Sequence, residues 1–106
     1  MANEPRSYRE AIALALELSR PYAEVVTVEP EELDAEVRQF LPRLVICSQV
    51  TAVVEARVPV WIELYPEHGA DSVVNFGARR STVAGMEMED LIRIFDHAES
   101  FSLGVV

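Results

Sequence analysis

The stretch RLVICSQV, residues 43–50, decides the fold class of this chain. It contains an apolar run that is followed by the hydroxyl residue Ser48. An apolar run without alternation is typical of a parallel strand covered on both faces. Residues 43–48 therefore predict a central strand of an α/β sheet. Ligands bind at the carboxyl ends of such strands, which makes Ser48 a candidate site residue. Cys47, within the apolar run, is interpreted as an inert core residue.

The segments around this strand complete an α/β pattern. Residues 5–20 and residues 30–41 place apolar side chains at helical spacing, the second with Leu33, Val37 and Phe40 on one face. Between them, the β-branched run at residues 23–30 predicts a strand. Residues 51–57 can form a helix of about two turns before the next strand-like run, VPVWIELY. Strands alternating with helices predict a flavodoxin-like or receiver-like three-layer sandwich with right-handed crossovers.

The second half of the chain predicts an antiparallel hairpin at residues 60–84. Residues 66–71 are all that separate two strand-like runs, and these are too few for a parallel crossover. A further strand is expected near residues 81–84, so the sheet should be mixed, with a parallel core. The sequence MEMEDLIRIFDHA then spaces Met88, Leu91, Ile92 and Phe95 as a closing helix would.

Length and composition bound the classes of function. The chain has 106 residues, half of them hydrophobic, which fits one domain over residues 1–106. Nine basic against 18 acidic residues give a net charge of −9, which excludes nucleic acid and anionic membranes as expected partners. The single cysteine and two histidines form no metal-site spacing, so no metal or cofactor is expected. No signal sequence or membrane-length apolar run is found, and we expect a soluble, cytoplasmic protein.

Over residues 2–48, the chain resembles the receiver domains of bacterial response regulators. The segment ANEPRSYREAIALAL is similar to the region that follows a receiver's first strand, and it places Asn3 and Glu4 where receivers hold magnesium with an acidic pair. The segment LPRLVICS is similar to the third strand and places Ser48 at the phosphorylated aspartate. Further on, GADSVV resembles the fifth strand, but no lysine follows it. The resemblance implies a receiver-like fold with a degenerate phosphoacceptor pocket formed by Asn3, Glu4 and Ser48.

Phosphoryl transfer to a receiver needs a carboxylate nucleophile, carboxylates that hold magnesium and a cation for the phosphoryl oxygens. Serine makes no acyl phosphate, so the resemblance implies a pseudoreceiver, which is a signalling or protein-interaction module rather than an enzyme. Arg79 and Arg80, near the hairpin turn, are candidate contacts for an anion or a partner. Charges at a strand edge also protect against edge pairing, and both interpretations stay open.

The two ends of the chain raise a further expectation. A receiver needs a central first strand before its acidic pair, yet only Met1 and Ala2 precede Asn3. The tail FSLGVV, residues 101–106, is strand-like. We therefore expect this C-terminal strand to fill the central first-strand position, as in a circular permutant. Exchange of the tail between two molecules would give a swapped homodimer. A frayed tail is the remaining alternative.

Two alternatives to the interaction module stay open. The chain could be a small ligand-binding or anion-binding protein, or an enzyme, that uses the crevice at the carboxyl ends of the strands, with Asn3, Glu4 and Ser48 lining it. An engineered or rearranged receiver-like scaffold would explain why the tail completes the missing strand. If the chain is an interaction module, its signal must pass through a protein partner or through self-association.

Overall fold

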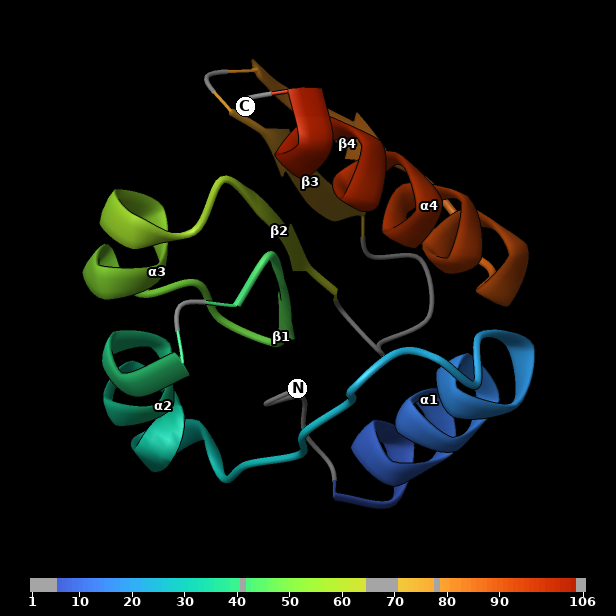
Figure 1. The fold of residues 1–106 in the computed structure, drawn as a ribbon, viewed down its shortest axis with the longest axis horizontal. Helices are drawn as coiled ribbons and strands as arrows, with labels where there is room; N and C mark the ends of the chain where they lie inside the picture. Colours follow the sequence, from blue (N-terminus) through green and yellow to red (C-terminus); the bar gives the residue numbers. More distant parts are fainter. Residues whose placement is uncertain (1–5, 41, 65–70, 78, 105–106) are drawn as a thin grey trace.

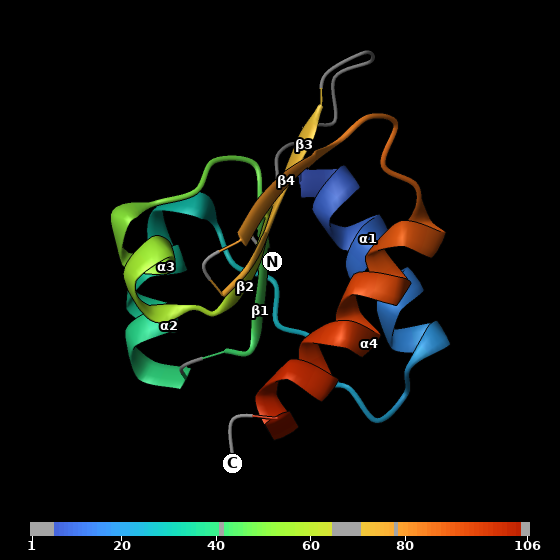
Figure 2. The ribbon, with the colours of Figure 1, turned by 90° about the horizontal axis from the view of Figure 1, so that it is seen from above.

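The protein forms three layers, with helices on both faces of one sheet. The structure is a computed structural model that describes residues 6–40, 42–64, 71–77 and 79–104. The helices α2 and α3 lie on one side of the sheet, and α1 and α4 lie together on the other (Figures 1 and 2). In chain order the elements are α1 Arg6–Ser19, the 3-10 helix η1 Pro30–Glu32, α2 Leu33–Phe40, β1 Leu44–Cys47, α3 Ala52–Arg57, β2 Val60–Glu63, β3 Ser72–Phe76, β4 Arg79–Val83 and α4 Met88–Gly104.

The sheet is mixed, and its strand order is β1-β2-β3-β4. The strands β1 and β2 are parallel, with Val45 beside Trp61, and the short helix α3 makes the crossover between them. The strands β2, β3 and β4 pair antiparallel in succession. The expected mixed sheet and the antiparallel hairpin at residues 60–84 are therefore confirmed. The parallel part of the sheet consists of one strand pair.

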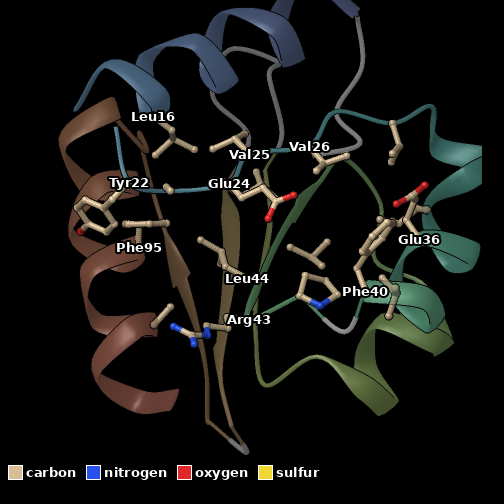
Figure 3. A pocket seen from close by; sticks show the side chains of 18 residues that line it. Leu16, Tyr22, Glu24, Val25, Val26, Glu36, Phe40, Arg43, Leu44 and Phe95 are labelled. Atoms are coloured by element: carbon tan, nitrogen blue, oxygen red, sulfur yellow. The ribbon is translucent and has the colours of Figure 1, made fainter. Parts of the chain in front are cut away.

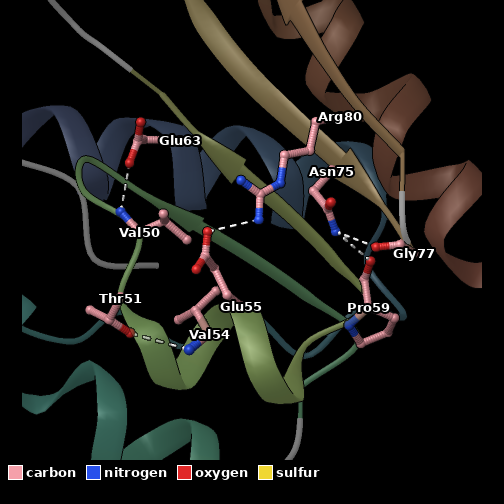
Figure 4. A network of polar contacts seen from close by, with 9 residues as sticks. All are labelled: Val50, Thr51, Val54, Glu55, Pro59, Glu63, Asn75, Gly77 and Arg80. Carbon is pink, nitrogen blue, oxygen red and sulfur yellow. Dashed lines mark hydrogen bonds and ion pairs between the residues drawn. The ribbon is translucent and has the colours of Figure 1, made fainter.

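A tight turn and a buried amide close the β3–β4 hairpin. Gly77 has a φ of 59°, which a two-residue hairpin turn requires and which glycine adopts without strain. The side-chain amide of the buried Asn75 donates hydrogen bonds to the carbonyl oxygens of Pro59 (3.2 Å) and Gly77 (2.9 Å; Figure 4). The Gly77 N–H also donates to the Pro59 carbonyl at 2.7 Å. These bonds tie the turn to the start of β2.

The core between the sheet, α2 and α3 is apolar, and hydrogen bonds of Thr51 connect the two helices beside it. It contains Val45 and Trp61 from the sheet with Val37 and Val54 from the helices. The hydroxyl of Thr51 accepts a hydrogen bond from the Val54 N–H (3.2 Å), which caps α3. The same hydroxyl donates to Asp34 at 2.6 Å and so connects α3 to α2.

A second core lies between the sheet, α1 and α4. Ile12 and Leu16 of α1 and Leu91 of α4 pack there against Ile46 and Ile62 of the sheet. The segment that follows α1 is held against α4 by Arg20, which donates to both carboxylate oxygens of Asp96 at 2.8 and 2.7 Å. Because the guanidinium favours the charged form, it lowers the pKa of the Asp96 carboxyl.

Three expectations about the sheet are wrong. Residues 101–104 are the last turn of α4, which ends at Gly104, so the tail does not form a first strand; residues 105–106 lie outside the described residues. Residues 23–30, expected as a strand, are irregular as far as Glu29 and then enter η1. The strand β1 lies at the edge of the sheet and not at its centre. The three errors share one cause. The tail was expected to lie between residues 23–30 and β1, so without it β1 is at the edge of the sheet and residues 23–30 are not part of the sheet.

Candidate functional site

The carboxyl ends of β1 and β2 bring Ser48 and Glu63 to the same edge of the sheet. The two strands are parallel with Cys47 beside Glu63, and Ser48 follows Cys47 directly. A carboxylate oxygen of Glu63 accepts a hydrogen bond from the Val50 N–H at 2.8 Å, which holds the chain after β1 against β2 (Figure 4). The sequence prediction did not include Glu63 in this crevice. Its signal was the acidic residue near the end of the strand-like run VPVWIELY, since β2 ends at Glu63.

The other two residues of the predicted pocket, Asn3 and Glu4, lie outside the described residues. Ser48 is half-buried and uncharged, and Glu63 is occupied by the Val50 amide. The described part of this crevice therefore offers one carboxylate that already serves a structural hydrogen bond.

Cys47 is not an activated nucleophile. Its side chain is buried in the core beside α2 and α3, and burial, assisted by the charge of Glu63, raises the pKa of the thiol to about 12. At neutral pH the thiol is protonated, whereas nucleophilic attack requires the thiolate. The interpretation of Cys47 as a core residue agrees with this environment.

Arg79 and Arg80 lie on β4, at the opposite edge of the sheet from Ser48. The Arg80 guanidinium donates to Glu55 at 2.8 Å (Figure 4). It also lies 5.2 Å from the centre of the Trp61 ring. It therefore connects the hairpin to α3. Arg79 is exposed. The strand order separates both arginines from Ser48, so the two sets of candidate residues do not form one site.

A cavity of about 510 Å³ runs beside β1, on the side away from β2. One wall carries Leu16, Phe95 and Tyr22, from the α1 and α4 side, and the other wall carries Phe40 and Glu36 of α2 (Figure 3). Leu44 of β1 and residues of the segment 22–28 also contribute to the lining. We call this cavity the β1 groove. Its volume is in the range of small-ligand sites.

Large apolar side chains of the β1 groove are open to solvent. Val26 is 46% exposed and Phe40 is 62% exposed, although the sequence predicted Phe40 on the packed face of its helix. Exposed apolar side chains that line one cavity, rather than being scattered singly, mark interaction sites. The groove also contains Glu24, Glu36 and Arg43, which place charge at its margins.

No family model, curated protein or solved structure matches the chain. Within the described residues, no three His, Cys, Asp or Glu side chains are grouped so that they could hold a metal ion. In the same part of the chain, each helix is too short or too polar to cross a membrane. The fold class shown is a three-layer α/β fold with a mixed sheet.

Proposed function

We propose that this chain is a non-enzymatic, receiver-like module of signalling that acts by binding another protein, and that the β1 groove is its binding site. The observation that carries the proposal is the apolar groove along a strand edge, with Val26 and Phe40 exposed at its margin. Binding grooves of proteins are concave and mostly apolar with a few polar groups, as this one is. The proposal needs no cofactor and no covalent chemistry.

The receiver-like aspect of the proposal rests on the resemblance and on the layered α/β fold. It assigns no phosphoacceptor role to Ser48, because a hydroxyl lacks the charge that helps to bind magnesium and forms no acyl phosphate. The nearby carboxylate of Glu63 already accepts the Val50 N–H. The module is therefore expected to signal through binding alone.

Titration with magnesium and beryllofluoride, followed by amide NMR, tests the lack of phosphoryl chemistry. We expect no saturable shift at Ser48 or Glu63, since the described part of the crevice offers one carboxylate, which is already engaged and is too little to hold the ion. The variant Ser48→Asp, which supplies the missing carboxylate, is expected to remain silent because no cation replaces the lysine. Saturable shifts at both residues in the wild-type protein would instead favour a phosphate-binding or enzymatic crevice.

Selection of short peptides from a display library tests the groove. We expect enriched peptides to bind the variants Val26→Lys and Phe40→Lys at least about tenfold more weakly, which corresponds to about 1.4 kcal/mol. Both side chains are exposed, so the substitutions should alter the stability of the protein by no more than about 0.5 kcal/mol.

The matched control is Leu18→Lys, because Leu18 is an exposed apolar residue of α1 at 74% exposure and is not among the residues that line the groove. This variant should bind the selected peptides as the wild-type protein does. A library that yields no binder, or binders that respond equally to Leu18→Lys, would contradict the proposed function.

A further inference from the structure

Within the described residues, the β1 groove contains a strand edge that pairs with no other strand. The Cys47 carbonyl accepts a hydrogen bond from the Leu64 N–H at 2.8 Å, on the β2 side. Because successive residues of a strand direct their main-chain groups to opposite sides, the N–H and C=O groups of Leu44 and Ile46 are directed away from β2 and into the groove. Among the described residues, no backbone hydrogen bond crosses this edge of β1. These groups can pair with another strand.

The space beside this edge is covered by apolar side chains on both faces of the sheet. On one face lie Leu16, Leu44 and Ile46, from the core shared with α1 and α4. On the other lie Val37 and Val45, from the core shared with α2 and α3. A strand directs successive side chains to opposite faces. A strand placed here would therefore meet apolar surface at every position, which favours consecutive apolar residues over alternating ones.

Charge at the groove restricts its occupant further. The carboxylates of Glu24 and Glu36 lie in its lining, and the whole chain has a net charge of −9. Arg43 is the cation among the described lining residues and lies just before β1. The field around the groove is negative, so a segment with lysine or arginine beside its apolar residues is attracted to it and an acidic one is repelled.

We propose that the β1 groove binds an extended segment of a partner protein, which adds a strand to the free edge of β1. The segment consists of four or five consecutive apolar, mainly β-branched residues next to a basic one, since β1 itself spans four residues or about 13 Å. Main-chain hydrogen bonds to Leu44 and Ile46 supply affinity, and the apolar walls supply selectivity. This inference rests on the proposed function and names the class of partner.

The experiment uses the peptide acetyl-Lys-Val-Ile-Val-Ile-Lys-amide and the full chain, observed by amide NMR. On titration we expect saturable shifts at Val26 and Phe40, together with slower hydrogen exchange, by roughly tenfold, at the Leu44 and Ile46 amides. Two further peptides carry N-methyl groups on alternate amides, one on each of the two alternating sets. Methylation of the set that faces β1 should abolish binding, because it removes the donors to β1, and methylation of the other set should weaken binding less. The same peptide with aspartate in place of both lysines should bind more weakly.

The outcomes separate the inference from the proposed function. Shifts at Val26 and Phe40 without protection of Leu44 and Ile46, or equal tolerance of both N-methylated sets, would show binding in another geometry and overturn the added strand alone. Absence of binding by this peptide and by every library peptide would overturn both proposals. A dimer that forms with rising protein concentration and is abolished by Phe40→Lys would assign the groove to a second copy of the chain, and would overturn the partner segment.

Discussion

Ile62→Ala is expected to lower the free energy of unfolding by about 2 to 5 kcal/mol. The Ile62 side chain has no exposed surface, and the residue lies between Ile46 and Val74 in the sheet, beneath α1 and α4. Truncation removes buried apolar area and leaves a cavity that two rigid neighbouring strands cannot close. Because a domain of this size has about 5 to 15 kcal/mol of total stability, the variant should be near the limit of folding.

The loss can be measured by urea denaturation followed through the fluorescence of Trp61, the single tryptophan, which is buried against α2 and α3 and is left unchanged. Two variants serve as controls. Ile62→Val should lose about 0.5 to 1.5 kcal/mol because it deletes one methylene group. Leu18→Ala, on the exposed face of α1, should change stability by about 0.5 kcal/mol or less. A loss below about 1 kcal/mol for Ile62→Ala would contradict the position of this residue at the centre of the sheet.

The helices and the hairpin could be predicted from local patterns. Residues 5–20 carry a helical period that α1 confirms, and the short interval between β2 and β3 leaves an antiparallel hairpin as the only connection. Sheet order could not be predicted in the same way. A β-branched run such as residues 23–30 becomes a strand only if a neighbour supplies hydrogen bonds, so its state depends on residues far along the chain.

The C-terminal tail, residues 101–106, also could not be assigned from its local sequence. FSLGVV has apolar residues but no period that separates strand from helix, and its first four residues continue α4 to a terminal glycine, a common end for a helix. Since the swapped homodimer depends on this strand, it loses its basis together with the permuted sheet. The tail was expected to lie beside β1. In the described residues, this place is the β1 groove.

The candidate groove could not be predicted because its lining comes from five segments that are far apart in the sequence, and their apolar residues have the appearance of core. Leu16, Val26, Phe40 and Leu44 are apolar residues within helical or strand-like patterns. Only the three-dimensional arrangement shows that Val26 and Phe40 are exposed while Leu16 is buried. Ser48 was placed correctly at a strand end, whereas its neighbour Glu63 required knowledge that β1 and β2 are parallel.

A buried cation is a second feature that the apolar pattern concealed. Arg9 lies three residues before Ile12 and seven before Leu16, and so shares the buried stripe of α1 with them. Its side chain is 4% exposed. Its terminal nitrogen donates to Glu29 at 3.1 Å, across from the helix to the segment before η1. The Nε atom is buried without a hydrogen-bond acceptor in the described part of the chain. Among the described residues, the guanidinium therefore depends on the carboxylate of Glu29 alone.

The asymmetry of this pair predicts opposite results for its two partners. Glu29→Ala should lower the free energy of unfolding by about 2 to 3 kcal/mol, because it leaves the buried guanidinium without a counter-charge. Arg9→Met should change stability by about 1 kcal/mol or less, since methionine fills the apolar space and Glu29, which is 47% exposed, remains hydrated. Denaturation of both variants and of the double variant measures the coupling.

The double variant Arg9→Met with Glu29→Ala should recover most of the loss caused by Glu29→Ala, because no buried charge then remains without a partner. The loss in Glu29→Ala should also persist at high salt, since a buried cation is screened far less than a surface one. Equal losses for Arg9→Met and Glu29→Ala would instead mean that the pair itself stabilises the fold. Such a result would mean that the ion pair between Arg9 and Glu29 stabilises the contact between α1 and the segment before η1. It would contradict the view that Glu29 only offsets the cost of burying the Arg9 charge.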